Sequence, residues 1–176
     1  MNVIQIAALT LLASLLTSLP VRAAESDDAL IEQGRYLARA GDCVACHTAK
    51  GGAPFAGGLG METPIGTVYS TNITPHSDGI GNYSFEDFDK AVRHGIGKSG
   101  SSLYPAMPYP SYARVSDADM HALYAYFMKG VAPVAEPNKP TDIPWPLSMR
   151  WPLAIWRGLF APAVSAYEPP PGSDPV

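Results

Sequence analysis

Two thiols and an imidazole stand close together in residues 43–47, which read Cys-Val-Ala-Cys-His. Cys43 and Cys46 are separated by two residues, and His47 follows directly. This spacing is the attachment signature of a c-type haem, in which each thiol adds to one vinyl group of the porphyrin. The next residue then lies under the iron, where an imidazole nitrogen is a suitable ligand. The segment therefore predicts one covalent haem, with His47 as the proximal iron ligand.

Three other uses of the two thiols compete with haem attachment. A thioredoxin-like redox pair would need a surrounding βαβ pattern, which the sequence lacks. A zinc site would need further ligands, but the chain has only two cysteines and its remaining histidines are scattered. A plain structural disulfide would leave His47 without a role. Haem attachment is favoured because it uses all three residues.

Length and charge limit the class of protein. The chain has 176 residues, enough for one domain plus an appendage or for two very small domains. Its net charge is −4, with no basic run, and becomes −5 without residues 1–23. This charge balance argues against a nucleic-acid partner.

An apolar run over residues 3–19 ends at Pro20 and is followed by small residues up to Ala23. This pattern predicts a secretory signal peptide, residues 1–23, cleaved after Ala23. The run has no Lys or Arg before it and is slightly short for a membrane span, so an uncleaved anchor stays open. With either outcome we expect a periplasmic protein, associated with the outer face of the inner membrane. Export agrees with haem c, which bacteria attach outside the cytoplasm.

Three segments carry helix start and stop signals. Residues 26–41 open with Ser and two Asp and close at a glycine. Gly34 lies in the apolar stripe of this helix, where it predicts close approach by another helix. Residues 84–95 and 116–130 each open with a Ser followed three residues later by Asp. The aromatic face of the last helix can cross the first at Gly34, and residues 48–82 read as loop with short extended pieces such as 67–70.

Met107 is the candidate for the sixth iron position. It lies in residues 103–112 between prolines at 105, 108 and 110, which fix φ and stiffen the loop. A thioether on a rigid loop, far along the chain from His47, suits a His/Met haem. The rival thioethers and imidazoles are Met61, Met120, Met128, His94 and His121.

The character of the chain changes at Ala132. Residues 132–176 hold 11 of the 18 prolines and all three tryptophans. This density of proline prevents a continuous helix, whereas a disordered linker would not carry three tryptophans. We expect residues 145–160 to pack on this domain, a further domain, another subunit or a membrane interface. Residues 168–176 are typical of an extended linker.

The order of these features resembles a class I cytochrome c domain. A closer resemblance is to the first haem domain of the tri-haem cytochrome c subunits of bacterial membrane-bound alcohol, gluconate, sorbitol and aldehyde dehydrogenases. It covers essentially the whole chain but about the first third of that family's pattern, with one CxxCH motif instead of three. We therefore expect either a truncated subunit or a mono-haem relative. The segments that carry the resemblance are 34–47, 55–74, 79–85, 104–112 and 124–134.

The resemblance implies a mainly α fold: a cytochrome c domain, residues 24–131, wrapped around one covalent haem, and a Pro/Trp-rich extension or linker, 132–176. Cys43 and Cys46 would be thioether sites, His47 the proximal ligand and Met107 the distal one. Subunits of that family accept electrons from a catalytic subunit and pass them to ubiquinone or a terminal acceptor. We expect the same here, with a dehydrogenase catalytic subunit, a quinone or downstream cytochrome or oxidase, and the membrane surface as partners.

A haem enzyme or a redox or gas sensor is the alternative function. It would need an open or bis-His distal site, and an enzyme would also need acid–base groups there. Arg93 beside His94 is the one pair that keeps this alternative open. The sequence contains no flavin, quinone or nicotinamide motif, so substrate oxidation by this chain alone is not expected.

Overall fold

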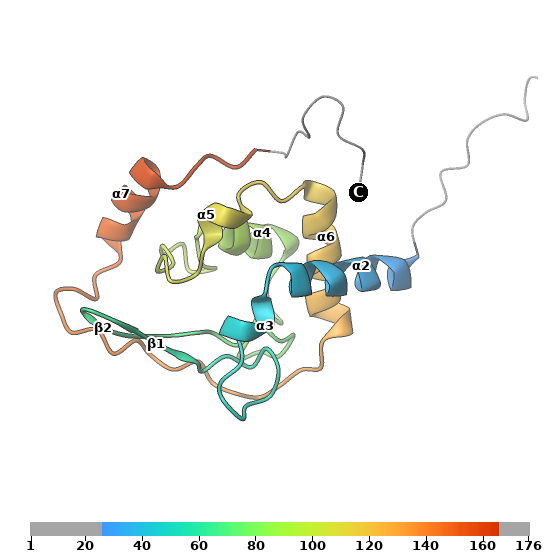
Figure 1. Cartoon of the computed structure of the whole chain (residues 1–176), viewed down its shortest axis with the longest axis horizontal. Coiled ribbons are helices and arrows are strands. Elements are labelled where there is room, and N and C mark those ends of the chain that lie inside the picture. The colour runs from blue at the N-terminus through green and yellow to red at the C-terminus, as the bar shows by residue number, and fades with distance from the viewer. Residues whose placement is uncertain (1–25, 166–176) are drawn as a thin grey trace, which may run out of the picture.

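A computed structural model describes residues 26–165 (Figure 1). The predicted signal peptide, 1–23, and the predicted linker, 168–176, lie outside the described residues. The described residues are mainly helical, as predicted, and also form one small sheet, which was not predicted. In chain order the elements are α2 (Asp27–Ala40), α3 (Cys43–Cys46), β1 (Gly60–Thr63), β2 (Gly66–Tyr69), α4 (Phe85–His94), α5 (Tyr109–Tyr112), α6 (Asp117–Ala125), the π-helix η1 (Tyr126–Gly130) and α7 (Trp151–Phe160).

Helices α2 and α6 cross at Gly34, where the two backbones touch (Figure 1). A Cβ atom at Gly34 would lie 2.0 Å from the carbonyl oxygen of Ala122, so no side chain fits here. The predicted close approach at Gly34 is confirmed. Around this crossing lies the core, whose buried members are Ala38, Ile80, Phe88, Met120, Leu123, Tyr126 and Phe127.

The predicted helix starts are confirmed. Ser26 accepts a hydrogen bond from a backbone N–H of the first turn of α2, and Ser116 does the same for α6. At α4 the bonds are reciprocal: the Ser84 hydroxyl accepts from the Asp87 N–H, and the Asp87 carboxylate accepts from the Ser84 N–H, both at 3.1 Å. These caps satisfy N–H groups that have no partner within the helix. The last predicted helix continues from α6 into η1 and ends at Gly130, as expected.

Residues 48–82 are mostly loop, and a short strand lies close to the extended piece predicted at 67–70; its partner strand β1 was not predicted. Strands β1 and β2 pair as an antiparallel hairpin, with Met61 opposite Val68. Each strand has four residues and begins with glycine, so neither shows the apolar alternation that identifies a strand from sequence. Gly66 opens β2 with φ at +133°, and a Cβ there would lie 2.0 Å from the carbonyl oxygen of Asp142.

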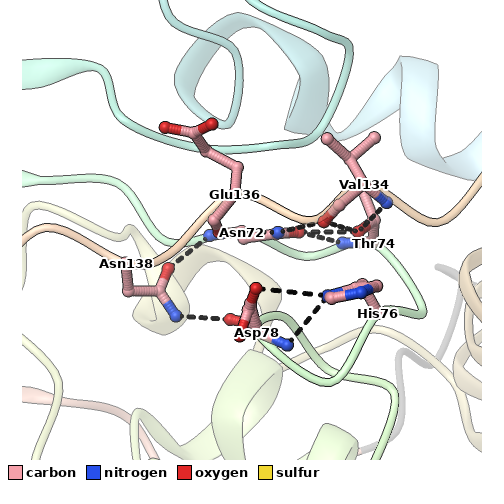
Figure 2. Close-up of polar contacts among 7 residues, drawn as sticks. All are labelled: Asn72, Thr74, His76, Asp78, Val134, Glu136 and Asn138. Atoms are coloured by element: carbon pink, nitrogen blue, oxygen red, sulfur yellow. Dashed lines mark hydrogen bonds and ion pairs between the residues drawn. The ribbon is translucent and has the colours of Figure 1, made fainter.

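A buried asparagine fastens the loop after β2 to the residues that follow η1 (Figure 2). The amide nitrogen of Asn72 donates to the carbonyl oxygens of Val134 and Glu136 at 2.9 and 3.0 Å. Its amide oxygen accepts from the N–H and hydroxyl of Thr74 at 2.9 and 2.7 Å. The side chain of Asn138 in turn accepts from the Asn72 N–H at 2.7 Å. All of the polar side-chain atoms of Asn72 are therefore satisfied, as a 1% exposed residue requires.

The extension after residue 131 runs past the hairpin before it returns as α7 (Figure 1). Asp142 and Thr67 exchange backbone hydrogen bonds of 2.8 and 3.3 Å, and Ile143 is only 7% exposed. The extension therefore packs on this domain, which is one of the four surfaces that were expected. The boundary between residues 131 and 132 stays a prediction. Within residues 26–165 no helix is long and apolar enough to cross a membrane.

Candidate functional site

Cys43 and Cys46 lie on the single turn of α3. Positions three apart share one face of a helix, so the two thiols lie on the same side. Asp42 enters the turn with a left-handed φ of 52°, and the His47 N–H closes it with a 3.0 Å hydrogen bond to the Cys43 carbonyl. Both cysteines are free thiols. Burial raises the pKa of the Cys43 thiol to about 11, so this thiol is neutral before any attachment.

The imidazole of His47 is held through one ring nitrogen. Its Nδ1 lies 2.7 Å from the carbonyl oxygen of Thr71. A carbonyl oxygen only accepts, so Nδ1 must carry the hydrogen, which leaves the lone pair on Nε2. Burial lowers the pKa of His47 and so favours this neutral form. The hydrogen bond to Thr71 acts in the opposite direction, but the effect of burial is larger. A ring nitrogen fixed by a backbone carbonyl, with the other free to bind, is the usual arrangement of a metal-ligating histidine.

A tyrosine connects the Met107 loop, residues 103–112, to the CxxCH turn. The hydroxyl of Tyr112 donates to the carbonyl of Gly41 at 2.8 Å. A Cβ atom built at Gly41 would lie 3.6 Å from the Tyr112 ring and 3.7 Å from Cys43 Sγ. Burial, followed by the nearby thiols, raises the pKa of Tyr112, which keeps its hydroxyl protonated. The end of the Met107 loop and the start of the attachment motif are thus brought together.

Met107 itself is partly buried and held by backbone bonds on both sides. Its N–H donates to the carbonyl of Tyr104 at 3.1 Å, and its carbonyl accepts from the N–H of Tyr109 at 2.8 Å. Of the rival methionines, Met120 is fully buried in the core and Met128 packs against it. Each therefore has a packing role already, and Met107 stays the predicted distal ligand.

The alternative ligands have local roles. His121 Nδ1 donates to the Asp117 carbonyl at 2.7 Å, and its ring stacks on Phe85 with the ring centroids 3.8 Å apart. Arg93, which was considered beside His94 for a haem enzyme, is 9% exposed and forms ion pairs with the carboxylates of Asp89 and Asp117. Its charge is thereby neutralised within α4 and α6.

The donor set fits a covalent haem. Two thiols share one helical face, and a neutral imidazole follows with Nε2 free. A thioether lies on a loop that is bonded to Gly41, two residues before Cys43. The zinc alternative would need three or more clustered ligands, and the part of the chain that the structure describes contains no such cluster of His, Cys, Asp or Glu.

Comparison with known proteins decides the family. The family described as Cytochrome c matches residues 31–130. The chain belongs to this family. A member of it is expected to carry covalent haem c, and residues 31–130 include the CxxCH turn and Met107.

This cytochrome c is similar to cytochrome subunits of three dehydrogenases. It is 72% identical over 153 residues to the gluconate 2-dehydrogenase cytochrome c subunit of Pantoea cypripedii, covering 86% of this chain and 35% of that protein. It is 58% identical over 154 residues to the alcohol dehydrogenase (quinone) cytochrome c subunit of Gluconobacter oxydans, covering 87% and 32%. Identity to the fructose dehydrogenase cytochrome subunit of Gluconobacter japonicus is 52% over 129 residues, covering 72% and 26%. The chain spans a quarter to about a third of the length of these relatives.

Sequence analysis missed two parts of the site, Thr71 and Tyr112. Thr71 acts through its backbone carbonyl, which every residue possesses, so no sequence signal marks it. Tyr112 closes the proline-rich loop, and its polar hydroxyl in a mostly apolar segment is a signal that a buried hydrogen bond exists. Its partner, the carbonyl of Gly41, lies 71 residues away and has no such signal.

Proposed function

We propose that this cytochrome c is an electron-transfer component of a dehydrogenase complex and carries out no substrate chemistry of its own. It would accept electrons from an alcohol, sugar-acid or aldehyde dehydrogenase subunit and pass them to ubiquinone or another respiratory acceptor at the periplasmic face. The observation that carries the proposal is His47, a neutral imidazole with Nε2 free beside two thiols on one helical face. The relatives, named as cytochrome subunits of dehydrogenases, support it.

Four side chains would hold the cofactor. Cys43 and Cys46 would bind one haem covalently, and His47 and Met107 would bind its iron. A bound haem supplies an iron that alternates between ferric and ferrous states. The protein's part is to keep both ligands in place during this change. His47 is fixed by Thr71, and Met107 lies on a proline-stiffened loop with backbone bonds on either side.

The C-terminal extension offers a docking surface for the dehydrogenase subunit. We define the outer α7 surface by its exposed apolar side chains: Trp145, Leu147, Trp151, Ile155, Leu159 and Phe160, each 52–80% exposed. Residues 143–165 contain no acidic side chain. Apolar surface of this extent is typical of permanent subunit contacts, and the names of the relatives identify them as subunits.

The test begins with attachment. We expect protein made with a c-haem maturation system to gain the mass of one haem, and this haem should survive denaturation and acid-acetone extraction. The matched control is Cys43→Ala with Cys46→Ala, which should release the haem. Reduction of the haem protein by a gluconate 2-dehydrogenase catalytic subunit and gluconate then tests electron acceptance. A mass without haem, or a haem that this subunit and its alcohol and fructose counterparts all fail to reduce, would overturn the proposal.

A further inference from the structure

The two arginines of the C-terminal extension contact the protein, whereas the side chains of the outer α7 surface are exposed. The guanidinium carbon of Arg150 lies 3.7 Å from the centre of the Tyr104 ring. Arg150 Nη1 also donates to the carbonyl oxygen of Ser102 at 3.1 Å. Arg157 Nη1 donates to the hydroxyl of the same residue at 2.7 Å. Ser102 is only 4% exposed and directly precedes the Met107 loop.

A tryptophan of α7 contacts the same loop beyond Met107. Trp156 meets the ring of Tyr109 edge-on, with centroids 6.5 Å apart. Tyr109 is 1% exposed, and its ring lies 2.6 Å from where a Cβ atom of Gly95 would be. The ring is therefore held between the end of α4 and α7. Because the Tyr109 N–H donates to the Met107 carbonyl, contacts from the extension fall on both sides of Met107.

These contacts are directional. No residue of α7 is fully buried, so burial of α7 contributes little to holding it in place. Charge-assisted hydrogen bonds and a stacked guanidinium instead fix position and angle. Their partners are a backbone carbonyl, a hydroxyl and an aromatic ring; within residues 26–165 neither arginine forms an ion pair. Directional contacts of this kind can hold the Met107 loop in one position relative to α7.

We propose that α7 braces the Met107 loop, with Arg150 and Arg157 as positioning residues that keep the distal thioether on the iron. The proposal rests on the proposed function, in which Met107 is the distal ligand. When the brace is loosened, the loop moves away more often and an external ligand reaches the iron more easily. The extension then has two roles: it holds the Met107 loop in place, and it carries the proposed docking surface.

The experiment uses the full-length ferric haem protein and imidazole as the external ligand. The variants are Arg150→Gln, Arg157→Gln and both together. Arg114→Gln is the matched control, because Arg114 is exposed and the substitution removes the same charge. We expect the double variant to bind imidazole about tenfold faster than the native protein, as loss of two charge-assisted bonds suggests. Arg114→Gln should bind at the native rate.

Two further variants separate geometry from charge and from general unfolding. Arg150→Lys keeps the charge but loses the planar stacking on Tyr104, so it should behave like Arg150→Gln. Ser102→Ala removes the hydroxyl that accepts from Arg157 and is a small change that should leave folding intact. Because both act on one bond, adding Arg157→Gln to Ser102→Ala should increase the imidazole rate no further. Additive effects would overturn the assigned contact.

Met107→Ala distinguishes failure of the brace from failure of the proposed function. If Met107→Ala leaves the weak ferric Met–iron absorption band in place, Met107 is not the ligand, and both the distal assignment and the brace are overturned. If Met107→Ala abolishes the band while the double arginine variant binds imidazole at the native rate, the brace alone is overturned. Faster imidazole binding in the double variant, with the band lost in Met107→Ala, supports both.

Discussion

At the scale of single residues, His47 and Met107 are held by different means. His47 is fixed by one short hydrogen bond to the Thr71 carbonyl, which selects the ring nitrogen left for iron. Met107 is fixed by its neighbours along the chain, through backbone bonds to Tyr104 and Tyr109. A thioether donor stabilises ferrous over ferric iron, so the proposed ligand pair would give a higher potential than two imidazoles.

The comparison of Met107→Ala with Met107→His tests this difference in ligand type. Both variants should lower the reduction potential and lose the ferric Met–iron band. Met107→His should remain six-coordinate, because imidazole also binds iron, whereas Met107→Ala should open the sixth position. Potentiometry and absorption spectra measure both quantities. Met61→Ala is the control and should change neither; a potential that moves with Met61 instead of Met107 would transfer the assignment to Met61.

The predictability of the site follows from how each residue acts. Cys43, Cys46 and His47 were predicted from the sequence because the chemistry of haem attachment fixes their spacing. Met107 stood out through its flanking prolines. The bond from His47 to Thr71 and the contacts of Arg150 and Arg157 depend on chain segments that meet only in the fold. Neither a backbone carbonyl nor an arginine in an apolar segment identifies its partner.

At the scale of elements, the crossing of α2 and α6 depends on a missing side chain. Gly34→Ala should favour the helix by about 1 kcal/mol through propensity. The new Cβ would nevertheless meet the Ala122 carbonyl at 2.0 Å, and such overpacking costs typically about 1–3 kcal/mol or more. We therefore expect a net loss of unfolding free energy, measured by denaturant titration of the haem protein.

Gly158→Ala is the matched control for the helix crossing. Gly158 lies within α7, and a Cβ there meets nothing within 4 Å. The same substitution should leave stability unchanged or raise it by up to about 1 kcal/mol through reduced backbone entropy in the unfolded chain. Equal losses at Gly34 and Gly158 would contradict the steric explanation.

The capping box of α4 gives a pH dependence. The hydrogen bond from the Ser84 N–H, with further bonds from Lys98 and the Ser84 hydroxyl, holds the pKa of Asp87 below its usual value. The stability that this carboxylate provides is therefore present above the unfolded-state pKa of about 4 and is lost as pH falls through the lower folded pKa. Asp87→Asn should unfold more easily than the native protein at pH 7 and equally at pH about 2. A difference that persists in acid would contradict this assignment.

Helices α2, α4 and α6 were predictable because each begins with a capping Ser. The β1–β2 hairpin was not, because four-residue strands that start with glycine show no periodicity. Gly34 was informative for a physical reason: a glycine amid apolar neighbours in a helix is costly unless another backbone lies against it. The path of the extension depends on Asn72, whose partners lie 62 to 66 residues further along.

At the scale of the whole molecule, the outer α7 surface is a cluster of exposed apolar side chains. Ile155→Ser with Leu159→Ser should weaken binding to the dehydrogenase catalytic subunit by about tenfold or more, since central apolar contacts dominate such interfaces. The haem spectrum should stay native, because both side chains face away from the Met107 loop. Calorimetry with the gluconate 2-dehydrogenase catalytic subunit measures the affinity.

Ile65→Ser is the control for docking, because Ile65 is an exposed apolar residue at the hairpin turn, remote in sequence from α7. It should bind the subunit with native affinity. Unchanged affinity in the α7 variant would refute the docking surface. Loss of binding to phospholipid vesicles in that variant, with subunit affinity intact, would assign the surface to a membrane.

The hydrogen bonds of Asn72 have a consequence for how the molecule responds to being bound. Thr71, whose carbonyl orients His47, directly precedes Asn72, and Asn72 is fastened to residues 134–138. The same extension continues to Arg150 and α7, which contact Tyr104 and Tyr109 of the Met107 loop. One stretch of chain thus contacts the segments that hold His47 and Met107, the two proposed iron ligands, and ends in an exposed apolar surface. A partner that shifts this stretch would move both proposed ligands together. The reduction potential of the haem protein would then differ between the free and the partner-bound state.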